Sequence, residues 1–409
     1  MAVPALVTVD PTGSLAVLGA IAAGVALGTA SGLTPGIHAN TFALGLASVV
    51  TIVPGAPRLV GAAMLAAGTA HTFLDVVPAL ALGVPDPAMA PSALPGHRLV
   101  IGGRGREALR LSALGSAVAV ALALPLAIPV TMVMERVYPL LIEDLPLALG
   151  AVAVLLVVGE RDRTAMVGAA LGLLASGALG LATLGLEPAA PLPIGGMLAP
   201  LFAGLFGAPV LIDSIGGAGV PPQDDARIAS APRDVGAVAA VGTACGAVVG
   251  YVPGVSSAIA ATATLGLLSD GDARAFIVAT SGVNTATTLF ALFALVALGS
   301  PRTGVMVAMQ EAGVPLDLPL LLASVLIAAA ISVTFVVVLG DRYLTVVGRF
   351  DPTILAIVIL GALVALAFLF AGFVGVGVFG VATIVGLVPP RFRARRVSLM
   401  GVLLVPLIL

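Results

Sequence analysis

The 409-residue sequence has no lysine and no tryptophan, one cysteine, three histidines and only 9% charged residues. A single cysteine excludes an internal disulfide and any C-x-x-C metal or redox motif. The histidines form no H-E-x-x-H zinc motif, and the lack of lysine excludes a phosphate-binding loop that ends in Gly-Lys. No G-x-S-x-G element occurs either. We therefore expect no enzyme activity, no cofactor and, at a net charge of −2, no nucleic-acid partner.

Hydrophobic residues make up 60% of the chain, and its mean hydropathy is +1.20, well above that of water-soluble domains. Nearly uncharged windows long enough to cross a bilayer recur along the sequence, some of them interrupted by Gly or Pro. The sequence predicts an all-α polytopic protein of the cell membrane with about ten to twelve hydrophobic segments. Because the N-terminus lacks a basic region and a cleavage site, we interpret the first segment as retained in the membrane.

Two segments of the chain share one pattern, in which three glycines spaced four residues apart precede a Pro-Gly pair. They run from Gly24 to Gly36 and from Gly242 to Gly254. The glycine rows are typical of close helix packing in membranes. A Pro-Gly pair breaks a membrane helix, and backbone broken at that depth persists only where it is buried in protein or lines a polar cavity.

Small polar residues follow both Pro-Gly pairs, and the N-terminus of a restarted helix presents free amide groups that suit an anion. We predict that the two elements form a cradle for a carboxylate or a phosphate. The predicted substrate-binding residues are Pro35, Gly36, His38, Asn40, Thr41, Pro253, Gly254, Ser256 and Ser257. The alternative is that each Pro-Gly pair only kinks a packed helix.

The duplication extends beyond the Pro-Gly pairs, because Ala-Leu-Gly-x-Pro occurs at 81–85 and again at 297–301. Arginines follow the first copy, whereas Glu311 and Asp317 follow the second, so the positive-inside rule predicts opposite orientations. The predicted units are a first membrane repeat over 1–218, a polar linker over 219–234 and a second repeat over 235–409. The fold prediction is two inverted structural repeats with broken, re-entrant helices at the Pro-Gly motifs, as in many secondary transporters.

Two groups of arginines predict which ends face the cytoplasm. The first lies in the loop Arg98–Arg110, and the second comprises Arg391, Arg393, Arg395 and Arg396. We interpret the C-terminal group as a stop-transfer signal that contacts anionic lipid. It is followed by an apolar tail, 397–409, which is too short to span the membrane.

A second set of polar residues lies between the matched motifs of each half. Asp75 is an ionisable group in an apolar run, which is costly unless it faces a cavity, a cation or a partner. On a helix His71 would share its face, so a structural Asp75 paired with His71 or an arginine is the alternative. The predicted cation- or proton-coupling residues are Asp75, Thr72, Ser281, Asn284 and Thr285, with Na⁺ at Asp75 and Asn284 the one metal ion considered. Asp213 is a further candidate for a buried acid, or else an interfacial residue.

Together these motifs resemble the large membrane subunit of the tripartite tricarboxylate transporters, the TctA-like family. The segments that carry the resemblance are Gly-Leu-Thr-Pro-Gly at 32–36, Gly-Tyr-Val-Pro-Gly at 250–254, Leu-Gly-Val-Pro at 82–85 and Ala-Leu-Gly-Ser-Pro at 297–301. The chain resembles a divergent, short member, with Pro85-Asp86 and Pro301-Arg302 where the family has Pro-Gly. The resemblance implies carboxylate import coupled to a cation gradient, with Pro35, Gly36, Pro253 and Gly254 on the substrate-cradling breaks and Asn284 in the family's Asn pair.

We predict a cation-coupled secondary transporter that moves a small organic anion, carboxylate- or tricarboxylate-like, with Na⁺ or H⁺. The alternative within transport is a translocase of a phosphate-headed lipid carrier such as polyprenyl phosphate, because helix N-termini also suit phosphate. Two alternatives from a different functional class are a membrane-embedded enzyme and a non-transporting scaffold, but the sequence contains no catalytic motif that supports an enzyme. The expected partners are the small anionic substrate, membrane lipids and, by resemblance, a small membrane subunit and an extracytoplasmic binding protein; a homodimer stays open.

Overall fold

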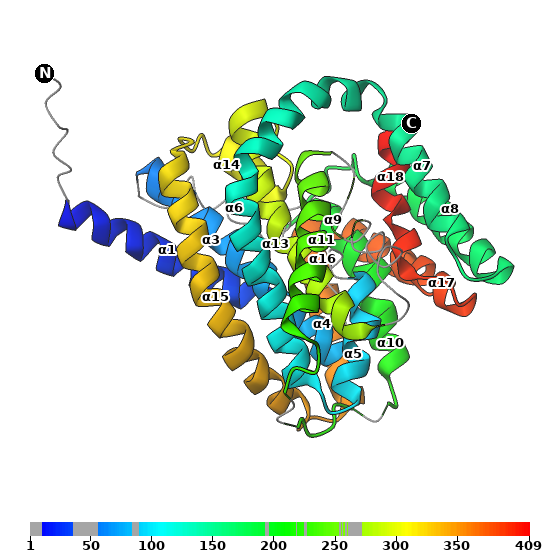
Figure 1. Cartoon of the computed structure of the whole chain (residues 1–409). Helices are drawn as coiled ribbons and strands as arrows, with labels where there is room; N and C mark the ends of the chain where they lie inside the picture. Colours follow the sequence, from blue (N-terminus) through cyan, green and yellow to red (C-terminus); the bar gives the residue numbers. More distant parts are fainter. Residues whose placement is uncertain are drawn as a thin grey trace, which may run out of the picture.

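The computed structural model describes residues 10–35, 56–83, 90–192, 196–217, 219–224, 227–252, 255, 257, 260 and 272–409. Within these ranges the secondary structure is helical, with no strand (Figure 1). Eight helices there are long and apolar enough to cross a membrane, and three shorter apolar helical segments accompany them. The all-α prediction is therefore confirmed for the part of the chain that the structure describes.

The helices of the first half are α1 (Pro11–Gly32), α3 (Pro57–Leu74), α4 (Val76–Leu82), α5 (Ala90–Ile101), α6 (Gly105–Glu143), α7 (Leu145–Val158), α8 (Arg163–Thr183), α9 (Leu198–Phe202), the π-helix η2 (Ala203–Gly207) and α10 (Ala208–Ser214). Those of the second half are α11 (Pro232–Tyr251), α13 (Ala273–Leu298), α14 (Gly304–Glu311), α15 (Leu318–Val347), α16 (Pro352–Gly386), α17 (Val388–Arg391), the 3₁₀ turn η3 (Arg396–Met400) and α18 (Gly401–Ile408).

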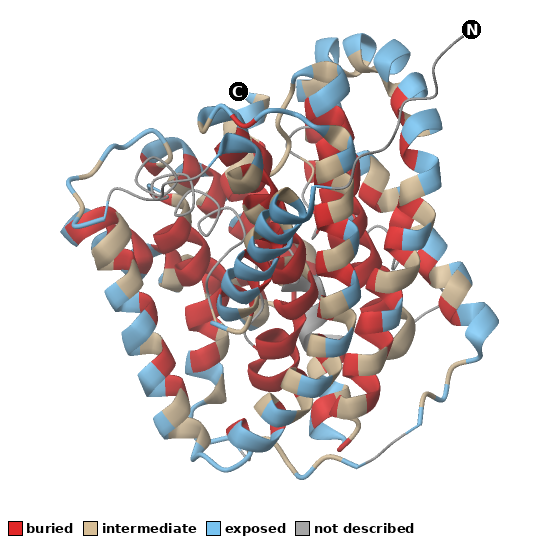
Figure 2. Cartoon of the chain, turned by 90° about the vertical axis from the view of Figure 1, so that its left-hand side faces the viewer, coloured by how far each residue is buried: buried red, intermediate tan, exposed pale blue. Residues whose placement is uncertain are grey.

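Burial divides these helices into a core and a surrounding layer. In the most apolar 18 residues of the α3–α4 segment 89% of the residues are buried, and in those of α13 83% are. In the corresponding stretches of α1 and α16 only 22% of the residues are buried. Figure 2 shows the same contrast, with mostly buried central helices and outer helices that carry exposed residues along one face. Since the exposed faces bear leucine, isoleucine, valine and phenylalanine, the outer layer suits contact with lipid.

The glycine rows bring each flanking helix close to a core helix, as predicted. A Cβ atom added at Gly24 would lie 2.2 Å from the carbonyl oxygen of Ala63, and one at Gly28 would lie 2.1 Å from that of Ala67. Gly242 of α11 stands in the same relation to α13, where the added Cβ would lie 2.6 Å from the Ala279 carbonyl oxygen. Only glycine allows these backbone approaches, so both rows are packing surfaces.

The two core segments end in the same way and run in opposite directions. Gly83 ends α4 and Gly299 ends α13 in the left-handed region, with φ of 67° and 63°. A Cβ at Gly61, early in α3, would meet Val314, which follows α14. At the other end, Gly96 of α5 packs between Leu80 of α4 and Ile277 of α13. The start of each core segment therefore lies near the end of the other.

Each core segment is packed between one helix from its own half and one from the other half. The segment α3 contacts α1, which precedes it in sequence, and α15 of the second half. The helix α13 contacts α11, which precedes it, and α6 of the first half. The two halves are thus interleaved rather than side by side. Their division at 218 and 235 stays a prediction, although the described polar linker residues are non-helical up to the start of α11.

One membrane-length helix is broken at a place that the sequence pattern did not indicate. Helix α16 loses helical geometry at Ala371 and at Gly372, where φ is 60° and ψ is −157°. The amide of Leu192 donates a hydrogen bond of 2.9 Å to the Leu369 carbonyl beside the break. A Cβ at Gly372 would lie 2.3 Å from the Ala189 carbonyl oxygen. A non-helical segment of the first half therefore packs against the interrupted helix and uses its freed backbone.

The C-terminal tail is part of the folded core. A Cβ at Gly180 of α8 would lie 2.1 Å from the Val402 carbonyl oxygen, which places α18 directly on α8. Two arginines of the C-terminal group have protein partners: Arg395 pairs with Glu160 at 3.1 Å and Arg396 with Asp213 at 2.8 Å. The Asp213 side chain is 48% exposed, so the buried reading of this residue is wrong, and its interfacial location stays a prediction.

The predicted basic loop is mostly helical. Arg98 lies in the last turn of α5, residues 102–104 form a short turn, and Arg106 and Arg110 already belong to α6. Its cytoplasmic location, like that of the C-terminal arginines, stays a prediction.

Candidate functional site

The predicted substrate-binding residues fall largely outside the described residues. The structure describes Pro35 and Ser257, of which Ser257 is buried. The others, Gly36, His38, Asn40, Thr41, Pro253, Gly254 and Ser256, lie outside the described ranges. What the structure does place is the end of each preceding helix. Helix α1 ends at Gly32 and α11 ends at Tyr251, so both stop two or three residues before their Pro-Gly pair, as the sequence predicts.

Asp75 and Asn284, two of the predicted coupling residues, are in direct contact. Asp75 lies between α3 and α4 and is 3% exposed, and Asn284 lies in the middle of α13 and is 6% exposed. The Asn284 amide donates to Asp75 Oδ2 at 2.7 Å and to the backbone carbonyl of Thr72 at 3.3 Å. Because one amide bonds both a carboxylate and a carbonyl, this contact ties the two antiparallel core segments together in the centre of the bundle.

The end of α1 packs onto the backbone at Asp75. A Cβ added at Gly32 would lie 3.2 Å from the Asp75 amide nitrogen and 3.0 Å from the His71 carbonyl oxygen. One residue earlier, the Ser31 hydroxyl lies 2.8 Å from His71 Nδ1, and this histidine is completely buried. The predicted cation-coupling residue and the helix that leads into the first Pro-Gly pair therefore lie next to each other. Ser31 and its bond to His71 were not predicted, since a serine in a small-residue row reads as packing.

The remaining coupling candidates face a different helix. The Ser281 hydroxyl lies 2.8 Å from that of Ser112, and the Thr285 hydroxyl donates to Ser116 at 2.8 Å. Ser116 also donates to the Ser281 backbone carbonyl at 3.3 Å. All four side chains are buried. The predicted set therefore divides, with Asp75, Thr72 and Asn284 between α3 and α13, and Ser281 and Thr285 between α13 and α6. This hydroxyl ladder satisfies buried polar groups within the membrane.

Tyr251 anchors the helix that leads into the second Pro-Gly pair. Its side chain is fully buried, and its hydroxyl lies 2.5 Å from the Thr131 hydroxyl of α6. Its ring packs on Phe290 of α13 with 6.2 Å between centroids. This role was not predicted from the sequence. A signal was present, because the chain has only three tyrosines and one of them stands directly before Val-Pro-Gly.

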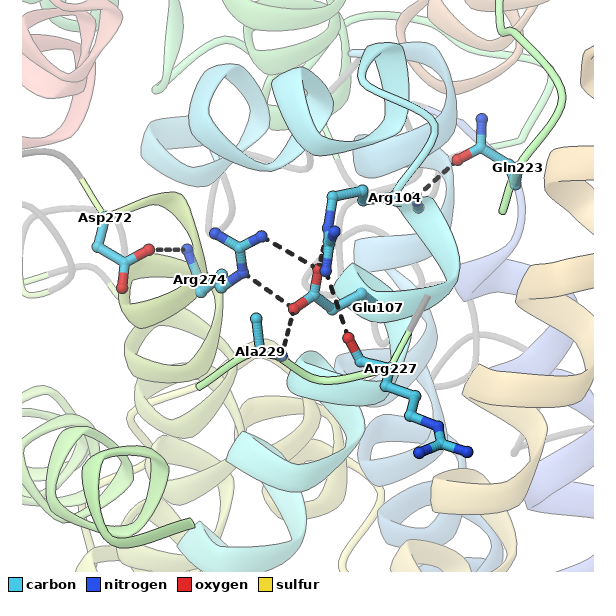
Figure 3. Close-up of polar contacts among 8 residues, drawn as sticks. Arg104, Glu107, Gln223, Arg227, Ala229, Asp272 and Arg274 are labelled. Atoms are coloured by element: carbon cyan, nitrogen blue, oxygen red, sulfur yellow. Dashed lines mark hydrogen bonds and ion pairs between the residues drawn. The ribbon is translucent and has the colours of Figure 1, made fainter. Parts of the chain in front are cut away.

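A charged cluster joins the first turns of α6 and α13. The completely buried Glu107 carboxylate pairs with Arg104 at 2.6 Å and with Arg274 at 2.9 Å. The backbone amide of Ala229, in the segment before α11, donates to the same carboxylate at 2.8 Å (Figure 3). The Arg104 guanidinium in turn donates to the Arg227 carbonyl at 3.3 Å. One carboxylate therefore ties both halves and the linker together.

No three His, Cys, Asp or Glu side chains within the described ranges are grouped as a metal site.

Comparison with known proteins gives a direct assignment. The model of the Tripartite tricarboxylate transporter TctA family matches residues 18–401. The chain belongs to this family.

One relative is an uncharacterized protein of Methanocaldococcus jannaschii, which is 24% identical over 398 residues that cover 94% of this chain and 96% of that protein. No solved structure matches the chain significantly.

Membership of the TctA family identifies the chain as a component of a tripartite tricarboxylate transporter, a class of secondary transporter. The family works with a small membrane subunit and a binding protein. Together with the eight apolar helices, it makes this chain a multi-pass membrane protein.

Proposed function

We propose that the chain is the large membrane subunit of a transporter that imports a small carboxylate, and that Asp75 couples this import to Na⁺ or H⁺. The observation that carries the proposal is the Asp75–Asn284 contact. It joins one core segment of each half at a buried carboxylate, and the backbone of Asp75 packs against the last turn of α1, just before Pro35.

The chemistry of this contact supports coupling. A hydrogen bond to an ionised carboxylate is about twice as strong as one between neutral groups. Binding of a proton or Na⁺ at Asp75 would reduce the negative charge on the carboxylate. The hydrogen bond from Asn284 to Asp75, which joins α13 to α3, would then become weaker. A ligand shifts a conformational equilibrium only through such differential interactions. Occupancy of Asp75 would then bias the position of α1, because Gly32 lies against the Asp75 backbone.

We further propose that the two halves are inverted repeats that move relative to each other in alternating access. Three observations support this: the antiparallel core segments, the matching left-handed glycines at their ends, and the exchange of α6 and α15 between the halves. The lipid-carrier alternative is not taken further, because no contact of the described residues favours it and the family is one of tricarboxylate transporters.

The test is uptake of labelled citrate and smaller carboxylates by cells that express the chain with its small membrane subunit and binding protein. Uptake should follow an imposed Na⁺ or pH gradient in the wild type. Asp75→Asn, which keeps the shape of the side chain but removes its charge, should lose the dependence on the gradient. The matched control is Glu187→Gln, at an exposed acid without an ion pair in the described part of the chain, and it should transport normally. Gradient-driven uptake at the wild-type level in Asp75→Asn would rule out this coupling site.

A further inference from the structure

An apolar cavity lies among the ends of α4, α5, α10 and α15 and the start of α16. Its volume is about 260 Å³. The residues whose apolar side chains form most of its wall are Leu82, Ile101, Leu211, Val347, Leu355 and Ile359. Its rim includes Ile101 and Phe350, which are 50% and 56% exposed. His97 and Ser214 also line the cavity, and its exposed apolar rim suits an apolar ligand.

A second cavity, of about 340 Å³, adjoins the first and adds basic groups to a partly apolar lining. Val220 lines both cavities, and the consecutive residues 347–350 divide between them: Gly348 and Arg349 line the second, while their neighbours on both sides line the first. The charged residues of its described lining are two arginines, Arg106 and Arg349. Apolar and basic surfaces therefore meet along one short turn between α15 and α16.

Arg349 is available to a ligand at this place. Arg106 is engaged with Asp341 at 2.5 Å, whereas the structure gives the exposed Arg349 side chain no carboxylate partner among the described residues. The nearest acid in sequence, Asp351, is used as the N-cap of α16, where its carboxylate accepts the amides of Thr353 and Ile354 at 2.8 and 3.1 Å. An anion beside Arg349 would not compete with that cap.

We propose that these joined cavities bind an anionic phospholipid, with an acyl chain in the apolar cavity and the phosphate at Arg349. Basic pockets between membrane helices bind lipid headgroups of this charge. The apolar rim favours a ligand that arrives from the bilayer over a water-soluble carboxylate. The bound lipid would contact the ends of α4, α5, α10 and α15 and the start of α16, so it would hold elements of both halves at one end of the bundle.

The test uses the purified full-length protein in a neutral detergent, with lipid retention measured by native mass spectrometry and stability by thermal unfolding. Dioleoyl phosphatidylglycerol should bind and raise the melting temperature, and dioleoyl phosphatidylcholine should do so less. Arg349→Gln should weaken phosphatidylglycerol binding about fivefold, the effect of one arginine near a membrane surface. The control Arg342→Gln changes an exposed arginine that lines neither cavity and lies in α15, just before the turn that holds Arg349, and it should bind like the wild type.

Two further arms separate the acyl chain from the headgroup. Ala356→Leu, which fills part of the apolar cavity, should also reduce binding of phosphatidylglycerol. Glycerol 1-phosphate, which carries the headgroup chemistry without a chain, should not stabilise the protein at the lipid's concentration. Equal binding of both phospholipids, unchanged binding in Arg349→Gln, stabilisation by glycerol 1-phosphate alone, or displacement of the lipid by citrate would each overturn the proposal.

Discussion

The Glu107 carboxylate accepts bonds from two guanidinium groups and from the linker backbone, yet it is completely buried. Removing one member of a buried charge cluster leaves the others uncompensated. We expect Glu107→Gln to lower the free energy of unfolding by about 3 kcal/mol, at the lower end for buried pairs because Arg104 and Arg274 are partly exposed. Denaturation in mixed micelles would measure this.

The control for this substitution is Asp341→Asn. Its pair with Arg106 is half-buried on both sides, with 32% and 40% of the side chains exposed, so its loss should cost less than about 1 kcal/mol. Equal losses for the two variants would mean that the Glu107 cluster is no more important than a surface ion pair.

Tyr251 offers a second test at the scale of one side chain. Tyr251→Phe keeps the ring against Phe290 but removes the hydroxyl that bonds Thr131. Because Thr131 also donates to the Ala127 carbonyl at 2.6 Å, the stability cost should be only about 1 kcal/mol. If this bond positions the second Pro-Gly element, the KM for substrate should rise several-fold while the amount of folded protein stays unchanged. An unchanged KM in a transport assay would make the bond purely structural.

Among the helices, α1 and α11 depend on close backbone contact with the core. Gly28→Ala places a methyl group 2.1 Å from the Ala67 carbonyl oxygen, so α1 must move away from α3. We expect a loss of about 2 kcal/mol, typical of overpacking, measured as a lower melting temperature. In Gly19→Ala on the same helix the added methyl group would meet no heavy atom within 4 Å, so this variant should be neutral or slightly stabilising. A similar loss in both variants would contradict close packing as the cause.

Helix ends and glycine contacts could be predicted from sequence because both depend on local chemistry. Proline stops α1 and α11, and the rows of small residues mark the faces that approach the core. The pairing of Asp75 with Asn284 was within reach because an ionisable group in an apolar run needs a partner. The Glu107 cluster and the break at Gly372 were not, because each depends on contact with a segment more than a hundred residues away. Neither contact leaves a periodic pattern in the sequence.

At the scale of the whole molecule, the proposed inverted repeats place Arg98 and Glu311 on opposite sides of the membrane. Both side chains are exposed and suit single-cysteine labelling after Cys245→Ala removes the native thiol. In right-side-out vesicles an impermeant maleimide should label Glu311→Cys directly, and Arg98→Cys only after permeabilisation. Labelling of both from the same side would exclude the inverted arrangement but would leave the contact between Asp75 and Asn284 in place.

The interleaving of the halves also affects how the chain is made. Asn284 follows Asp75 by 209 residues, so at roughly 5–20 residues per second the ribosome adds it about 10–40 s after it has added Asp75. During that interval Asn284 is not yet present to bond the carboxylate, and an ionised carboxylate facing hydrocarbon is strongly disfavoured. The nascent first half must therefore wait in a protonated form or at the insertion machinery. A pulse–chase experiment should reveal this as a lag between synthesis and protease resistance, shortened by Asp75→Asn.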